Sequence, residues 1–397
     1  MILDKLFHLM AEKQASDIFI SAGIPIHIKI QGNTVPVNQQ LMDSAMIEKI
    51  AFELMSLDQQ RTFEATMEMN LSFGVPGVGN FRVNIFRQRA SISIVVRYIL
   101  GNIPALDTLA LPTVLADLIM EKRGLILIVG STGSGKSTTI ASMLDHRNAN
   151  RSGHILTIED PIEFLFRHKK SIVNQRELGM DTLSWESALK NAMRQAPDCI
   201  LIGEIRDKET MQAAIAYAQT GHLCLATLHA NNSYHALNRV INFFPLDSRT
   251  SLYLDLSASL KAIVSQRLVK KPDGKRMPAA EILLNTRHVQ ELIERGEVLA
   301  VKEAMEQSLA PGSQTFEQDL FRLYRDGTIT LDEALSNADS PTNLSWLINN
   351  SEISSGAQGE ALHIEVPLDF SETDDGGTSF KEFTLSLETP EEQHNAQ

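Results

Sequence analysis

The sequence is poor in cysteine, in aromatic residues and in long hydrophobic runs. Only 2 of its 397 residues are cysteine, and Cys199 and Cys224 each lie in an apolar stretch. There is no C-x-x-C pair, so the sequence offers neither a zinc-binding nor a redox motif, and we expect two buried, inert thiols. No apolar run approaches the roughly 18 residues that a transmembrane helix requires, so no membrane-spanning segment is predicted.

The sequence also lacks an excess of basic residues, since 36 Lys and Arg face 49 Asp and Glu. Residues 351–397 carry 11 acidic residues and one lysine, a charge of −10, which leaves −3 of the total −13 for residues 1–350. A near-neutral body without a basic, aromatic-rich loop does not suit a protein that binds nucleic acid independently of sequence. The composition therefore argues against a ring helicase, and no nucleic-acid partner is expected.

Length and composition predict a two-domain globular protein. The residues are 43% apolar and 21% charged, which is typical of soluble proteins. The first 17 residues include Asp4 but neither a long apolar run nor a small-residue cleavage site. We therefore expect no secretory signal and a cytoplasmic location.

The chain divides into a small N-terminal domain and a larger α/β domain. Residues 1–99 combine an amphipathic helix, short strand-like runs and two further helical patterns, which predicts a small α+β domain. Residues 100–106 contain Gly101 and Pro104 and are predicted to form a hinge linker. In residues 107–345 apolar strands alternate with amphipathic helices, which indicates a largely parallel sheet with helices on both faces.

The last part of the chain is less regular. Residues 248–337, within the α/β domain, are predicted to be mainly helical. Residues 346–397 are rich in acidic residues, Ser and Gly, and are predicted to form a disordered tail with one β-like run at 380–387.

The chain is organised around the stretch LILIVGSTGSGKST at residues 125–138. A β-favouring run leads into G-x-x-x-x-G-K-S and then into a helix, which is the context that confirms a phosphate-binding loop. Backbone N–H groups of such a loop cradle phosphate oxygens, Lys136 adds positive charge, and the Ser137 hydroxyl is placed to ligate Mg²⁺. The predicted nucleoside triphosphate site consists of Gly130, Ser131, Thr132, Gly133, Ser134, Gly135, Lys136, Ser137 and Thr138.

Carboxylates follow two further strand-like runs. Glu204 closes the run at 198–204, where an NTPase places the acid that holds Mg²⁺ through water. Glu159, Asp160 and Glu163 follow another run, and hydrolysis needs a base that polarises the attacking water. Glu163 is the preferred candidate, but spacing alone does not rank the three.

Histidines and arginines complete the candidates. His222 enters and His229 leaves an apolar strand, and the one at the ligand edge is a candidate sensor of the γ-phosphate; a hydrogen-bonded structural role is the alternative. Four arginines cluster in the strands of the first domain, namely Arg82, Arg87, Arg89 and Arg97. They are candidates for neutralising charge at the nucleotide, and a solvated strand face is the alternative.

Four motifs in a fixed order resemble those of the secretion ATPases of the type II secretion and type IV pilus family. The phosphate loop is followed by TIEDPIEF at 157–164, PDCILIGEIRD at 197–207 and TGHLCLATLH at 220–229. These stretches resemble the Asp box, the Walker B motif and the His box of that family. The likeness covers about residues 1–345, and it favours the retraction branch (PilT/PilU) because the four-cysteine zinc module usual in the assembly branch is absent.

The resemblance implies a RecA-like P-loop ATPase domain preceded by a smaller PAS-like α+β domain. It implies that Glu163 is the catalytic carboxylate, Glu204 the Walker B acid and His229 the histidine linked to the γ-phosphate. Arg82 and Arg97 match first-domain arginines that reach the nucleotide. ATP and Mg²⁺ are the implied ligands.

The acidic tail and one departure in the sequence favour the accessory, PilU-like branch. PilT-like retraction ATPases carry AIRNLIR near the C-terminus, whereas the matching place here has Gln290 and Glu294 at two arginine positions. The resemblance implies a homo-hexameric motor at the inner-membrane base of the pilus, with a PilT-like paralogue and an inner-membrane platform protein as partners. The expected function is ATP-driven pilus retraction (twitching motility); a nucleotide-binding scaffold with little turnover of its own is the alternative.

Overall fold

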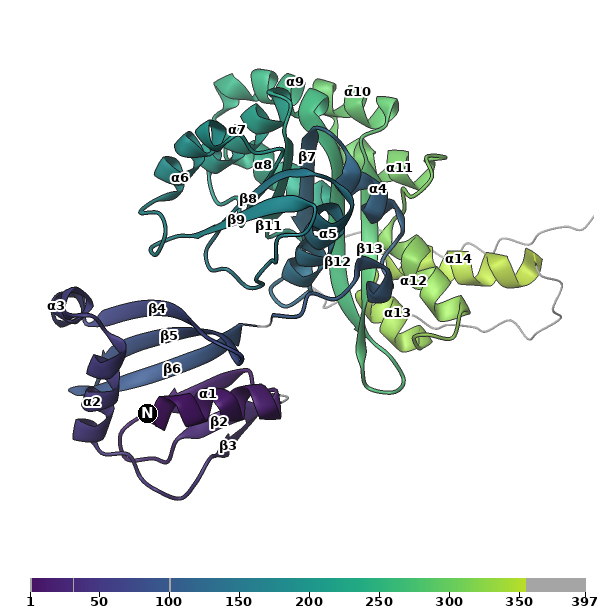
Figure 1. Ribbon diagram of the computed structural model, residues 1–397. Coiled ribbons are helices and arrows are strands. Elements are labelled where there is room, and N and C mark those ends of the chain that lie inside the picture. Colours follow the sequence, from purple (N-terminus) through teal and green to yellow (C-terminus); the bar gives the residue numbers. More distant parts are fainter. Residues whose placement is uncertain (1, 31, 100, 355–397) are drawn as a thin grey trace, which may run out of the picture. The chain divides into compact units, whose positions relative to one another are not determined.

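The computed structural model describes residues 2–30, 32–99 and 101–354. In these ranges the chain forms two β-sheets, one from strands that end by residue 99 and one from strands between residues 124 and 284 (Figure 1). No helix within these ranges is both long enough and apolar enough to span a bilayer. The β-like run predicted at 380–387 lies outside them.

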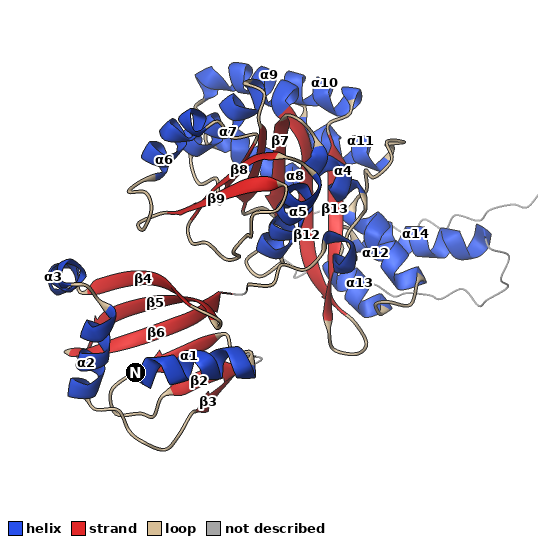
Figure 2. Ribbon diagram, in the orientation of Figure 1, coloured by secondary structure: helices blue, strands red, loops and turns tan. Residues whose placement is uncertain are grey.

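The first sheet has six antiparallel strands in the order β3-β2-β1-β6-β5-β4 (Figure 2). Its strands are β1 (Asp17–Ile20), β2 (His27–Ile30), β3 (Asn33–Pro36), β4 (Glu68–Val75), β5 (Gly79–Gln88) and β6 (Ser91–Ile99). The accompanying helices are α1 (Ile2–Lys13), α2 (Ser44–Leu54) and α3 (Leu57–Thr66). Leu6, Phe7 and Met10 recur at helical spacing on α1 and are buried against the sheet, which confirms the α+β prediction for this part.

The second sheet has seven strands in the order β13-β12-β7-β11-β10-β8-β9. Its strands are β7 (Gly124–Val129), β8 (Gly153–Glu159), β9 (Ser171–Glu177), β10 (Cys199–Ile202), β11 (Leu223–Leu228), β12 (Leu260–Lys270) and β13 (Arg276–Leu284). Neighbours are parallel except for β12 and β13. Leu125 and Leu127 pack in one buried cluster and Ile126 and Ile128 in another, because successive side chains of a strand point to opposite faces. Both faces are therefore buried, as the continuous apolar run predicts.

Helices cover both faces of this sheet (Figure 1). On one face lie α4 (Val114–Met120) and α5 (Lys136–Asn150). The other face carries α6 (Trp185–Ala192), α7 (Lys208–Gln219), α8 (Ser233–Asn242), α9 (Arg249–Ser259), α10 (Arg287–Arg295) and α11 (Val301–Glu306). Short 3₁₀ segments are Leu106–Leu109, Met193–Gln195, Leu246–Ser248 and Val298–Ala300.

The prediction that residues 248–337 are mainly helical is wrong for the hairpin of β12 and β13. Ile263 and Val264 of β12 are both fully buried, one on each face of the sheet. A strand buried on both faces has no polar–apolar alternation, so its sequence looks the same as that of a buried helix.

Three C-terminal helices share a separate core with this hairpin. They are α12 (Phe316–Arg325), α13 (Leu331–Asn337) and α14 (Pro341–Ser354), and their core includes Val269 and Ala279 of the hairpin. Helix α14 continues through the predicted tail boundary at residue 346, because its Leu344 and Ile348 are buried in this core. The other predicted domain limits stay predictions.

Candidate nucleotide site

A cavity of about 250 Å³ lies at the carboxyl ends of four neighbouring parallel strands, β7, β11, β10 and β8. The phosphate loop follows β7, Asp160 and Glu163 follow β8, Glu204 follows β10, and His229 follows β11; all of them line the cavity. Motifs that are far apart in the sequence meet here because parallel strands present their carboxyl ends at one edge of the sheet.

The phosphate loop is shaped by glycines that tolerate no side chain. A Cβ atom on Gly130 would lie 2.5 Å from the Gln266 carbonyl oxygen and 2.5 Å from Ser134 Oγ. Gly135 has a φ of +91°, in the left-handed region, directly before α5 begins. The loop therefore leads into a helix N-terminus, where backbone N–H groups and the helix dipole favour an anion.

The predicted phosphate-binding residues contribute in different ways. Those that line the cavity are Thr132, Gly133, Lys136 and Ser137. Lys136 Nζ donates to the carbonyl oxygens of Gly130 at 2.9 Å and Ser131 at 2.8 Å. Burial lowers the pKa of Lys136, and Glu204 and Glu163 act against this shift. Thr138 lines a different cavity, of about 630 Å³, together with Gly135 and Gln266.

Glu204 and His229 lie together at the cavity. His229 Nε2 is 3.4 Å from Glu204 Oε1, and Arg206 Nε donates to Glu204 Oε2 at 2.6 Å. Burial, followed by the nearby Lys136 ammonium, lowers the pKa of His229, which leaves its imidazole neutral at neutral pH. A neutral imidazole donates or accepts a hydrogen bond without adding charge to the site.

The carboxylates of Glu159, at the end of β8, and of Asp160 and Glu163, in the loop that follows, have different surroundings. Glu159 Oε1 accepts hydrogen bonds from Thr157 Oγ1 at 2.6 Å and from Gln175 Nε2 at 3.3 Å. Burial of this carboxyl group raises the pKa of Glu159 to about 7, although part of the residue reaches the cavity. Asp160 and Glu163 are exposed at the cavity. The geometry thus gives Glu159 a position held by its neighbours and leaves Glu163 at the open side.

The raised pKa of Glu159 predicts a contribution to stability that depends on pH. Between about pH 4.5 and about pH 7 the folded state holds the Glu159 proton more tightly than the unfolded state, so the free energy of unfolding should fall as pH rises, by at most about 3 kcal/mol. Glu159→Gln removes this titration. Urea unfolding across this pH range should therefore show the variant gaining stability relative to the wild type, whereas the exposed Glu186→Gln control should show no such trend. Parallel curves for Glu159→Gln and the wild type would contradict the assignment.

Some sequence candidates do not line the cavity. His222 Nδ1 lies 3.2 Å from the Tyr217 carbonyl oxygen, in agreement with the structural alternative. Arg82 and Arg97 are opposite each other on β5 and β6, and Arg97 Nε donates to Asp17 Oδ1 at 2.9 Å. The cavity is lined by residues between 132 and 229, so the nucleotide-contacting role of the two arginines stays a prediction.

The sequence reasoning missed Gln266, which supports the phosphate loop from β12. Its Oε1 accepts from Thr139 Oγ1 at 2.7 Å, and its Nε2 would lie 2.8 Å from a Cβ atom on Gly135. No local signal marks this residue, because β12 was expected to be helical. Arg206 was also missed, although it stands two residues after Glu204 in the same motif.

The donor set fits a magnesium ion that arrives with a nucleotide. Ser137 and Glu204 both line the cavity. Among the residues with known placement there is no group of three or more His, Cys, Asp or Glu side chains able to hold a metal ion by itself. Mg²⁺ keeps several waters and takes substrate phosphates as ligands, so one hydroxyl and one carboxylate suffice here.

Comparisons with known proteins agree with the motifs. A family model described as "Type II/IV secretion system protein" matches residues 1–292. The type IV pilus ATPase PilU of Pseudomonas aeruginosa is 46% identical over 382 residues, which are 96% of this chain and 100% of that protein. PilT of the same organism, a type IV pilus retraction ATPase, is 38% identical over 343 residues, 86% of this chain and 100% of PilT. A crystal structure of the pilus retraction motor PilT with bound ADP matches with a TM-score of 0.80 at 40% identity, over 86% of this chain and 99% of that chain.

Proposed function

This chain belongs to the type II/IV secretion system protein family and is an ATPase, and we propose that it is a hexameric motor that promotes retraction of type IV pili. One observation carries the proposal. The phosphate loop, Glu204 and His229 converge on one cavity, in a chain that resembles pilus ATPases along most of its length. The proposal includes ATP binding at this cavity, and it places the protein at the cytoplasmic base of the pilus.

The residues of the cavity divide the work of hydrolysis. Loop N–H groups and Lys136 bind and orient the phosphates. Ser137 and Glu204 would hold Mg²⁺, which would supply positive charge at the phosphate oxygens. Glu163 orients the attacking water and accepts its proton, since its carboxylate is exposed at the cavity. His229, kept neutral and beside Glu204, hydrogen-bonds near the γ-phosphate and so reports its presence.

Arg82 and Arg97 complete the site from a neighbouring subunit. Their guanidinium groups neutralise the charge that develops on the transferred phosphoryl group, as arginines supplied in trans do in other NTPases. In purified protein we expect Arg97→Ala subunits and Lys136→Ala subunits to be inactive separately. A mixture should regain part of the ATP turnover, because some sites then combine the intact Lys136 of one subunit with the intact Arg97 of its neighbour. A mixture as inactive as its components would contradict the arrangement.

The proposed role is accessory to a PilT-like paralogue. Gln290 and Glu294 replace two arginines of the PilT-like motif on α10, and Gln290 Nε2 lies 3.4 Å from Glu294 Oε1. A helix face that loses two positive charges and gains one negative charge offers a different surface to a partner. We propose that an inner-membrane platform protein is the other contact of the motor.

Replacement of Glu163 by Gln in the cell tests this function. We expect a strain with the gene deleted to show more surface pili and less surface motility than the wild type. Glu163→Gln should reproduce this phenotype if turnover drives the contribution to retraction. Wild-type motility in the deletion strain would contradict the proposal. The scaffold alternative predicts that Glu163→Gln retains motility while the deletion does not.

A further inference from the structure

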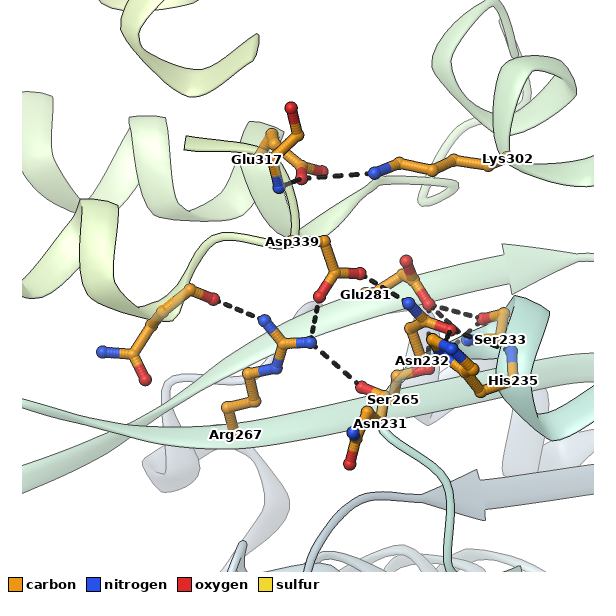
Figure 3. A network of polar contacts seen from close by, with 12 residues as sticks. Asn231, Asn232, Ser233, His235, Ser265, Arg267, Glu281, Lys302, Glu317 and Asp339 are labelled. Carbon is orange, nitrogen blue, oxygen red and sulfur yellow. Dashed lines mark hydrogen bonds and ion pairs between the residues drawn. The ribbon is translucent and has the colours of Figure 1, made fainter. Parts of the chain in front are cut away.

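The stretch from Asn231 to Ser233, where the loop that begins at His229 ends, is held by groups from outside the nucleotide cavity (Figure 3). The Asn231 carbonyl oxygen accepts from Arg267 Nη2 at 3.2 Å. Asn232 Nδ2 donates to Asp339 Oδ2 at 2.6 Å, and the Ser233 N–H donates to Glu281 Oε1 at 2.7 Å. Three consecutive residues are thus anchored to β12, to β13 and to the connection between α13 and α14.

Asp339 is the junction of this network. One of its carboxylate oxygens accepts from Asn232, and the other forms an ion pair with Arg267 on β12. Asn232 is the N-cap of α8 and also accepts from the His235 N–H at 2.9 Å through its Oδ1. Its side chain therefore has one end committed to the helix and the other to Asp339. Since Asn232 is only 8% exposed, water does not easily replace Asp339 as a partner.

The connection that carries Asp339 is fixed to the C-terminal helices. Arg267 Nη1 donates to the Asn337 carbonyl oxygen, and its Cζ lies 3.9 Å from the centre of the Phe316 ring at the start of α12. The Ser340 N–H donates to Glu317 Oε1 at 2.8 Å. Because α12, α13 and α14 also share a core, the position of Asp339 follows the position of these helices.

We infer that Asp339 is a positioning residue for the loop that carries His229, and that it links the C-terminal helices to ATP turnover. The inference rests on the proposed role of His229. The loop leaves the sheet at His229, directly after β11, and its other end is held at Asn231 and Asn232. A shift of Asp339 therefore moves that other end and, with it, the short segment that carries His229. Because the coupling free energy between two sites is reciprocal, a change at the nucleotide that moves the loop must also favour one position of the C-terminal helices.

Exchange of the two side chains tests the link. In Asp339→Asn the new amide has only one oxygen and cannot accept from both Asn232 and Arg267, and in Asn232→Asp two carboxylates face each other. In the double variant the amide at 339 donates to the carboxylate at 232 and accepts from Arg267, which restores the hydrogen bond between the two positions. Asp at 232 remains a good N-cap. We expect each single variant to lower kcat about three- to thirtyfold, with KM for ATP within about twofold of wild type, since the phosphate loop does not depend on the link. The double variant should recover kcat to within about twofold.

Three further variants of the full-length protein make the result specific. Asp332→Asn, on the exposed side of α13, is the matched control and should turn over ATP like the wild type. Asn232→Ser retains an N-cap hydroxyl but cannot reach Asp339, so it supplies the same test should the charged variant fail to fold. In a His229→Ala background the link variants should cause no additional loss of kcat, because their effect passes through that residue.

The outcomes separate the inference from the proposed function. Single variants with wild-type kcat overturn the inference alone, as does an equal loss of kcat with and without His229. A double variant no better than the singles identifies a general folding defect and also overturns it. If His229→Ala itself turns over ATP like the wild type, the role of His229 fails, and the inference fails with it.

Discussion

Lys136→Ala should abolish most ATP turnover, with a loss of at least about 100-fold, and weaken nucleotide binding at least about tenfold. Lys136 Nζ lies within the phosphate loop, and the residue is only 9% exposed. An ammonium in a poorly solvated site interacts with phosphate far more strongly than it would in water, so no other side chain of the loop replaces it. Turnover measured by phosphate release and binding measured with a fluorescent ADP analogue test the two effects.

The loss should be specific to this lysine. Lys190 on α6 is exposed, and Lys190→Ala should leave both measurements unchanged. Since Lys136 also donates to two loop carbonyl oxygens, circular dichroism should establish that the variant is folded. A folded Lys136→Ala protein with wild-type turnover would remove the phosphate loop from the proposed mechanism.

Glu163→Gln should lower kcat about 10²- to 10⁴-fold while nucleotide affinity stays within about threefold of the wild type. The amide has nearly the same shape as the carboxylate and still orients water, but it does not accept a proton at neutral pH. Steady-state kinetics together with equilibrium nucleotide binding separate the two effects. The exposed Glu186→Gln on α6 serves as the control with the same chemical change.

The neighbouring carboxylates provide the decisive comparison. Glu159 is held by Thr157 and Gln175 and keeps a proton up to about pH 7, so Glu159→Gln resembles the protonated form and should cost at most about tenfold in kcat at neutral pH. Asp160 Oδ2 lies 3.6 Å from Arg206 Nη1, and Arg206 in turn donates to Glu204. Asp160→Asn should therefore change kcat mainly by shifting Arg206 and Glu204. If Glu159→Gln or Asp160→Asn lowered kcat more than Glu163→Gln does, the base would be that residue and not Glu163.

Local sequence determines the parts of this protein whose chemistry depends on neighbours in the chain. The phosphate loop is one such part, because its glycines, Lys136 and the start of α5 are consecutive. The strand β7 is another, since its uninterrupted apolar residues are buried on both faces of the sheet. The order of the four motifs was also sufficient to predict the family and the ATPase activity, which the comparisons confirm.

Tertiary structure decided the features that join distant segments. The hairpin of β12 and β13 was predicted to be helical, because a segment buried on both sides shows no period. For this reason no sequence signal indicated that Gln266 of β12 supports the phosphate loop. The carboxylates of Glu159, Asp160 and Glu163 have the same sequence spacing in any conformation, and only the contacts of Glu159 with Thr157 and Gln175 distinguish it from Glu163.

The sequence by itself indicated a nucleotide site through the phosphate loop, since a loop and its helix are local structures whose requirements are local. The sheet decided that Glu204 and His229 meet at that site, through the adjacency of β10 and β11. The pairing of Asn232 with Asp339, 107 positions apart, was decided by the packing of the C-terminal helices on β12 and β13. Hydrogen bonds and burial act over a few ångströms in space, so contacts between distant segments are fixed only when the chain has folded.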